Sequence, residues 1–311
     1  MRMETILDLI GDTPMVGVHQ LSPNPAVRIY AKLEGQNPGG SSKDRIARKM
    51  VELAERDGIL RPGATILEPS SGNTGIGLAL VAKLRGYRLR VVMPENVSVE
   101  RRQLLEIFGA EITLSPADEG SNGAIRRAQQ IAADEPGYVF LYQYGNPANP
   151  LAHYEGTGPE IWRDCPEVDV FVAGLGTSGT LMGVGRFLKE RKPEVRVVAV
   201  EPPAGELVQG LRNLEDGFVP PIFSPDVLDR KLIVRPRESI EWTRRLLEEC
   251  GVFAGISSGA AIAGAVKVAA TIDAGTVVTL LPDGGWKYLS SGAWTDDIDV
   301  VEERAQRINY W

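Results

Sequence analysis

Residues 65–75 read Thr65-Ile66-Leu67-Glu68-Pro69-Ser70-Ser71-Gly72-Asn73-Thr74-Gly75. An apolar run of strand length, Thr65–Glu68, leads into a loop of small and polar residues and then into a helical pattern over Thr74–Arg85. The same order returns where Val170–Ala173 leads into a glycine-rich loop. Strands that alternate in this way with longer helical segments are typical of a parallel sheet covered by helices, so the sequence predicts an α/β fold.

Further strands and helices extend this alternation along the chain. The other expected strands are Val27–Leu33, Leu89–Met93, Glu111–Leu114, Val139–Tyr142, Val195–Val200 and Thr276–Leu281. The other expected helices are Ser42–Arg56, Ser98–Phe108, Ala117–Ala133, Ser178–Glu190, Ser239–Glu249 and Ser257–Ala270. The strands form one set before residue 145 and one set after it, which predicts two doubly wound units with the active cleft between them.

The composition of the 311 residues is that of a folded, soluble protein, with 43% hydrophobic and 24% charged residues. The net charge of −7 argues against nucleic acid as the main partner, and no apolar stretch reaches membrane-spanning length. Charges at Arg2, Glu4 and Asp8 argue against a signal peptide. Cys165 and Cys250 stand outside any metal-type or disulfide pattern, so we expect no metal site and a cytoplasmic location.

A lysine follows a turn-rich loop at the start of an expected helix. The loop is Asn37-Pro38-Gly39-Gly40-Ser41-Ser42, and Lys43 comes next. The helix dipole disfavours a positive charge at this end, and burial favours loss of the proton, which prepares an amine for Schiff-base chemistry. The alternative is a solvated surface lysine beside Asp44.

Three loops offer polar groups at helix N-termini, where backbone N–H groups favour an anion. The first contains Ser70, Ser71, Gly72, Asn73 and Thr74; the second contains Gly176, Thr177, Ser178, Gly179 and Thr180; the third contains Ser257. The second is the best phosphate cradle, although it lacks a Walker ending and a dinucleotide fingerprint. The alternatives are ordinary helix caps for the first and third loops and a structural turn for the second.

In chain order, these segments resemble the fold-type II family of enzymes that use pyridoxal 5′-phosphate (PLP). The likeness is closest to the cysteine synthases, and among them to cysteine synthase B, the O-phosphoserine sulfhydrylase type. It also covers Gly11-Asp12-Thr13-Pro14, Gln143-Tyr144-Gly145-Asn146-Pro147-Ala148-Asn149 and Asp283-Gly284-Gly285-Trp286-Lys287-Tyr288-Leu289-Ser290. Ser42, Ser70 and Ser178 depart from the family pattern, and none of them removes a reacting group.

The resemblance implies a smaller subdomain over residues 35–145 and a larger PLP-binding subdomain over residues 13–34 and 146–311. It implies that Lys43 holds PLP as a Schiff base, that Asn73 contacts the ring hydroxyl and that Ser257 meets the pyridine nitrogen. It assigns the cofactor phosphate to Gly176, Thr177, Ser178, Gly179 and Thr180. It assigns the substrate carboxylate to Ser70, Ser71, Gly72, Asn73, Thr74 and Gln143.

The implied reaction is replacement of the β-substituent of an activated serine by sulfur, giving L-cysteine. Because a serine does not hold the pyridine nitrogen protonated, Ser257 favours elimination and replacement at Cβ over transamination. An O-acetylserine-preferring sulfhydrylase, cystathionine β-synthase and serine dehydratase remain the alternatives. The family likeness further implies a homodimer.

Two features bear on the substrates. Arg212 enters a loop that borders the substrate side chain in the family, where a guanidinium suits the phosphate of O-phosphoserine. A surface ion pair with Glu215 or Asp216 is the alternative. The tail Arg307–Trp311 ends in two aromatics, which indicates either docking near the site or packing on its own domain. The first reading makes a small ubiquitin-like carrier protein with a thiocarboxylate a candidate sulfur donor beside sulfide.

Overall fold

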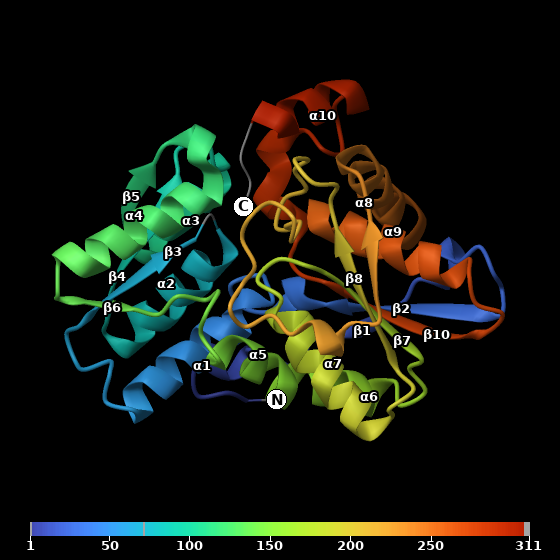
Figure 1. The fold of residues 1–311 in the computed structure, drawn as a ribbon, viewed down its shortest axis with the longest axis horizontal. Helices are drawn as coiled ribbons and strands as arrows, with labels where there is room; N and C mark the ends of the chain where they lie inside the picture. The colour runs from blue at the N-terminus through green and yellow to red at the C-terminus, as the bar shows by residue number, and fades with distance from the viewer. Residues whose placement is uncertain (1, 71, 308–311) are drawn as a thin grey trace.

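The computed structural model describes residues 2–70 and 72–307, which form two β-sheets covered by helices (Figure 1). The first sheet has the strand order β1-β2-β10-β7-β8-β9, with β1 antiparallel to β2 and the other pairs parallel. Its strands are β1 (Met15–Gly17), β2 (Val27–Leu33), β7 (Val170–Gly174), β8 (Arg196–Glu201), β9 (Arg230–Ile233) and β10 (Gly275–Leu281). The second sheet is fully parallel, in the order β5-β4-β3-β6. Its strands are β3 (Thr65–Pro69), β4 (Arg88–Pro94), β5 (Glu111–Ser115) and β6 (Tyr138–Phe140).

Helices connect the parallel strands. The α-helices are α1 (Lys43–Arg56), α2 (Asn73–Arg85), α3 (Val99–Phe108), α4 (Gly120–Asp134), α5 (Ala148–Ala152), α6 (Gly158–Asp164), α7 (Gly179–Arg191), α8 (Pro236–Cys250), α9 (Ile256–Ala269) and α10 (Ile298–Arg307). A π-helical turn, His153–Thr157, joins α5 to α6. Short 3₁₀ helices span Ile6–Leu9, His19–Leu21, Glu34–Gln36, Ala117–Glu119, Pro225–Val227 and Gly285–Ser291. In the described residues, no helix is long and apolar enough to cross a membrane.

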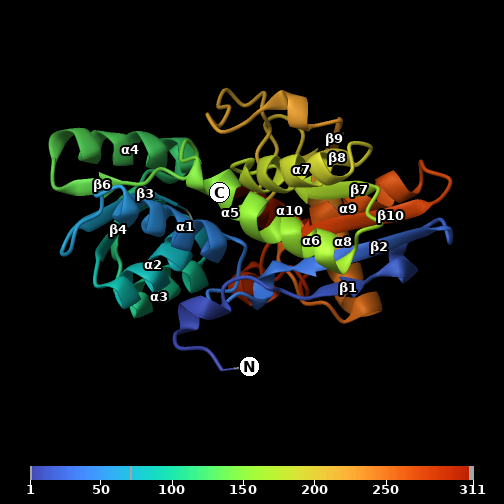
Figure 2. The same cartoon turned by 90° about the horizontal axis from the view of Figure 1, so that it is seen from below.

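The four-stranded sheet is covered on both faces because its strands are apolar on both sides. Ile66 of β3 packs with helices α1, α2 and α3 in one cluster, whereas its neighbour Leu67 packs against Ile131 of α4 in another. Figure 2 shows α4 on one side of this sheet and α2 and α3 on the other. This alternation of adjacent residues gives the doubly wound arrangement.

The six-stranded sheet repeats the pattern on a larger scale. Val172 of β7 faces the cluster with α8 and α9, and its neighbour Phe171 faces the cluster with α6 and α7. The predicted α/β architecture with two doubly wound units is therefore confirmed. The predicted division of the strands at residue 145 is wrong for β2, which precedes that residue but pairs with β10 in the six-stranded sheet.

Several elements differ from the sequence prediction. Two strands, β1 and β9, and three helices, α5, α6 and α10, were not predicted. Helix α4 begins at Gly120 rather than Ala117, because residues 117–119 form a separate 3₁₀ turn. Helix α8 begins at Pro236 rather than Ser239, since proline has no N–H to donate and its φ suits the first turn.

Candidate active site

The loops predicted to carry chemistry meet at one pocket between the two sheets. From the predicted site residues, the pocket is lined by Lys43, Ser70, Gly72, Asn73, Thr74, Gln143, Gly176, Thr177, Ser178, Gly179, Thr180, Arg212 and Ser257. Ser71 lies outside the described residues. The carboxyl ends of β3 and β7 both open toward this pocket, which is where parallel α/β sheets place their ligands.

Lys43 is the first residue of α1, and its side chain is partly buried in the pocket. Its Nζ donates a 3.2 Å hydrogen bond to Ser42 Oγ. Burial lowers the pKa of the Lys43 ammonium, although the carboxylates of Asp283, Glu34 and Asp44 act in the opposite direction. An amine that gives up its proton readily can act as a nucleophile or a base at neutral pH.

The loop after β3 is held in shape by its own hydrogen bonds and by Gln143, which follows the neighbouring strand β6. Ser70 Oγ accepts from the backbone N–H of Gly72 at 3.3 Å and of Gly75 at 3.0 Å, which closes the loop at the start of α2. Thr74 Oγ1 donates to Gln143 Oε1 at 2.6 Å. Ser70, Thr74 and Gln143 are therefore brought together as one polar group at a helix N-terminus, and such a group suits a carboxylate.

The loop after β7 fits a phosphate. Ser178 precedes α7 and has φ of 70°, the left-handed region that favours glycine. Its Oγ is buried and has no hydrogen-bond partner in the described part of the chain, so it can bind a ligand oxygen. A Cβ at Gly179 would overlap Asn149 Oδ1, which explains a glycine there. This helix N-terminus thus offers a donor, backbone N–H groups and the positive end of a 13-residue helix.

A buried histidine supports the phosphate loop. His153 Nε2 lies 3.2 Å from Thr180 Oγ1, and its Nδ1 lies 2.9 Å from Thr157 Oγ1. Burial lowers the pKa of His153 to about 3, with the positive charge of Lys43 adding to the effect. The imidazole is therefore neutral near pH 7 and acts as a hydrogen-bond partner for two hydroxyls rather than as a cation.

Arg212 lies in the pocket and not on the surface. It is 5% exposed, and its Cζ lies 4.5 Å from the ring centre of Phe218 and 5.5 Å from that of Tyr144. Its Nη1 donates to Asn122 Oδ1 at 3.4 Å. Stacking occupies the face of the guanidinium, while its N–H donors lie along its edge.

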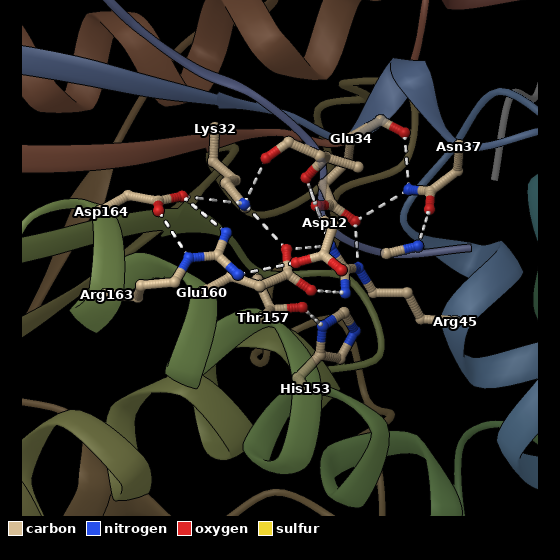
Figure 3. Close-up of polar contacts among 12 residues, drawn as sticks. Asp12, Lys32, Glu34, Asn37, Arg45, His153, Thr157, Glu160, Arg163 and Asp164 are labelled. Atoms are coloured by element: carbon tan, nitrogen blue, oxygen red, sulfur yellow. Dashed lines mark hydrogen bonds and ion pairs between the residues drawn. The ribbon is translucent and has the colours of Figure 1, made fainter. Parts of the chain in front are cut away.

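A buried ion network holds the start of α1 against the six-stranded sheet (Figure 3). Arg45 donates to Glu34 from Nε at 2.7 Å and from Nη2 at 2.8 Å, and to Glu160 from Nη1 at 2.6 Å. Lys32 Nζ lies 2.8 Å from Glu160 Oε2. Burial raises the pKa of Glu160, but the hydrogen bond and charge of Arg45 outweigh it and leave the pKa at about 2. The network fixes the turn that carries Lys43.

Several pocket residues were missed by the sequence prediction. Arg101, Tyr144 and Tyr288 also line the pocket, and Arg101 Cζ stacks 4.7 Å from the ring centre of Tyr288. Asn149 joins the two loops, since its Nδ2 donates to Gln143 O at 2.9 Å and to Thr177 Oγ1 at 3.0 Å. Tyr144, Asn149 and Tyr288 lie in stretches that resemble the family, whereas Arg101 lies outside them.

Comparisons with known families, sequences and solved structures all match this chain to enzymes. A family model described as pyridoxal-phosphate dependent enzyme matches residues 6–283. The cysteine synthase of Staphylococcus aureus (strain Mu50 / ATCC 700699) is 44% identical over 305 residues, covering 95% of this chain and 98% of that protein. The crystal structure of cysteine synthase from Entamoeba histolytica is 35% identical and superposes with a TM-score of 0.88, over 98% of this chain and 96% of the other. The structure of an O-ureido-L-serine synthase is 40% identical with a TM-score of 0.89, over 94% and 96% of the two chains.

Proposed function

Because the chain belongs to the pyridoxal-phosphate dependent enzymes, we propose that it is a cysteine synthase, which replaces the β-substituent of an activated serine with sulfur. The observation that carries this proposal is the single pocket that combines an amine of lowered pKa, a phosphate cradle and a carboxylate loop.

The residues of the pocket fit PLP. The buried Ser178 Oγ and the start of α7 suit its phosphate, and the Lys43 amine suits its aldehyde. Asn73 and Ser257, the latter in the first turn of α9, would contact the ring. When bound, PLP supplies an electron sink conjugated to Cα of the amino acid.

The chain's own residues then position the substrate and move its proton. Ser70, Thr74 and Gln143 hold the carboxylate, which fixes the Cα–H bond toward Lys43. The Lys43 amine takes the proton from Cα and returns it after sulfur has added at Cβ. Burial lowers the pKa of Lys43, which favours the unprotonated amine needed for the first of these transfers.

The sulfur comes from outside the chain. Burial raises the pKa of the Cys165 thiol to about 12, and burial also raises the pKa of Cys250. Neither residue lines the pocket. Sulfide or the thiocarboxylate of a small carrier protein remains the candidate donor. Tyr310 and Trp311, the aromatics of the predicted docking tail, lie outside the described residues.

We further propose O-phosphoserine as the preferred activated serine, because the buried Arg212 places a guanidinium in the pocket. A cytoplasmic homodimer remains the expected state of the enzyme, which size-exclusion chromatography with light scattering and cell fractionation would test.

The reaction is tested with purified protein reconstituted with PLP. We expect a visible absorbance band and formation of cysteine from O-phosphoserine or O-acetylserine only when a sulfur donor is present. Release of pyruvate at a comparable rate without sulfide would identify a serine dehydratase. Absence of the absorbance band would contradict the proposed cofactor.

Gln143→Ala should raise the KM for the amino acid by about tenfold, because a hydrogen bond to a charged carboxylate contributes about 1.5 kcal/mol or more. The dissociation constant of PLP should stay within about twofold of the parent value. Steady-state kinetics and a PLP titration measure the two effects. Gln130→Ala, at the exposed end of α4, is the matched control. Loss of PLP itself would show that Gln143 serves the cofactor.

Ser257→Asp should keep PLP bound but lower the rate of β-replacement by about tenfold or more, because a carboxylate holds the pyridine nitrogen protonated and stabilises carbanions that leave the pathway. The rate of cysteine formation and the absorbance spectrum check this result. Ser257→Ala leaves the nitrogen unprotonated and should retain most of the activity. Unchanged turnover in the aspartate variant would remove Ser257 from this role.

A further inference from the structure

Asn73 lies between two buried groups of opposite charge. Its Nδ2 donates to Asp283 Oδ2 at 2.7 Å, and its Oδ1 accepts from Lys287 Nζ at 2.7 Å. Asp283 is 1% exposed and Lys287 is 0% exposed. An ammonium can only donate and a carboxylate can only accept, so these partners permit one orientation of the Asn73 amide. If the amide were rotated by 180°, its NH₂ group would face the Lys287 ammonium and its oxygen would face the Asp283 carboxylate, and neither pair could form a hydrogen bond.

The two partners are themselves held in place. Asp283 Oδ2 also accepts from Tyr288 Oη at 2.5 Å, and its backbone forms a bridge with Ser41. Lys287 Nζ also donates to the carbonyl of Gly39 at 2.8 Å, in the loop that leads to Lys43. The segment after β10 thus joins the start of α2 to the loop before α1.

The free-energy cost of burying Asp283 and Lys287 indicates that this pair orients Asn73 rather than stabilises the fold. Burial lowers the pKa of Lys287 to about 8, and the nearby carboxylates of Asp283 and Asp44 oppose this effect without cancelling it. Keeping such a buried pair is costly, and apolar residues of similar volume often stabilise a fold equally well. Both polar atoms of the Asn73 amide are nevertheless hydrogen-bonded in this network, and buried hydrogen bonds of this kind specify a single geometry.

We propose that Asp283 and Lys287 are positioning residues that lock the Asn73 amide, so that the second N–H of Nδ2 is a fixed donor toward the pocket. Asn73 lines that pocket together with Lys43, and one of its two amide hydrogens is used by Asp283. The acceptor of the second hydrogen is the ring oxygen of PLP, and this part of the inference rests on the proposed function.

The lock itself is tested without cofactor, by thermal unfolding of the apoprotein in a double-mutant cycle. Asn73→Asp alone places two carboxylates against each other and should lower the melting temperature. Asn73→Asp combined with Asp283→Asn exchanges the groups, keeps the charge and restores both hydrogen bonds. We expect the second substitution to recover most of the lost melting temperature. Losses that simply add would overturn the lock.

The fixed donor is tested by PLP binding. The exchange variant keeps the network but has no side-chain N–H at position 73, so its dissociation constant for PLP should rise about tenfold and its absorbance band should shift. Lys287→Met should weaken PLP binding to a similar degree, whereas Lys287→Gln keeps a donor to Asn73 and should lose much less. Lys189→Met, which breaks an outer ion pair with Asp229, is the control.

The outcomes separate the two proposals. If the parent protein binds no PLP, the proposed function fails, and the unfolding cycle still decides the lock. If the cycle shows coupling but the exchange variant binds PLP with parent affinity and spectrum, the fixed donor is overturned. If Lys287→Met and Lys287→Gln weaken PLP binding equally, the lock through Asn73 is overturned even should the exchange variant fail to fold.

Discussion

Alanine in place of Lys43 is expected to lower kcat for cysteine formation by about 10⁴-fold. In the proposed function Lys43 takes the Cα proton, and general acid–base catalysis alone contributes about 10²–10⁴-fold. The proposal also makes Lys43 the amine that holds the cofactor covalently, so the absorbance band of the protein should change to that of free PLP. Stopped-flow and steady-state assays with O-phosphoserine and sulfide measure the loss.

Lys49→Ala provides the matched control for this prediction. Lys49 lies on the same helix and pairs with Glu155 at 2.7 Å, away from the pocket. Its loss should leave kcat within about twofold of the parent value, since an exposed ion pair contributes about 0–1 kcal/mol. If the Lys43→Ala protein stayed folded and kept more than a tenth of the parent kcat, Lys43 would not be the group that transfers the Cα proton.

Arg212→Ala is expected to lower kcat/KM for O-phosphoserine by about 30- to 150-fold and to leave kcat/KM for O-acetylserine within about threefold. A charge-assisted contact with a phosphate contributes about 2–3 kcal/mol, and acetate offers no such charge. The ratio of the two kcat/KM values is the decisive measurement, because a general loss of structure would lower both.

Arg212→Lys tests the geometry of the same contact. Lysine keeps the charge but lacks the planar fork and the stacking that Arg212 makes on Phe218, so an intermediate loss on O-phosphoserine is expected. If kcat/KM fell equally for both substrates, or fell for neither, O-acetylserine would become the preferred candidate substrate.

The long buried strands were predictable because apolar residues predominate in each of them. The predicted Val27–Leu33 matches β2 residue for residue, and Thr65–Glu68 falls one residue short of β3. Strands β1 and β9 have only three and four residues and lie at the two edges of the sheet, where a short run carries no distinctive pattern. Helix α6 was missed because Gly158 and Pro159 begin it, and both residues ordinarily interrupt helices.

The candidate site was predictable where its parts are local. The loops after β3 and β7 each combine a strand end, small residues and a helix start within a few positions, so the sequence alone indicates an anion site. The contacts of Asn149, Asp283 and Lys287 join segments that are far apart in the chain, and only the packing of the two sheets brings them together. Pairings of this kind leave no periodic trace in a single sequence.

The buried ion network of Figure 3 has a mechanical consequence. Arg45 bonds the first turn of α1 to Glu34 and Glu160, whereas further along the helix Ile46 and Met50 pack into the core of the four-stranded sheet. If the four-stranded sheet rotated relative to the six-stranded sheet, α1 would rotate about Arg45, which would act as its pivot. Lys43 lies two residues from this pivot, and Asn73 is hydrogen-bonded to Asp283, so both would move little, while the far end of α1 would move more. The amine would thus keep its position relative to the loop after β7.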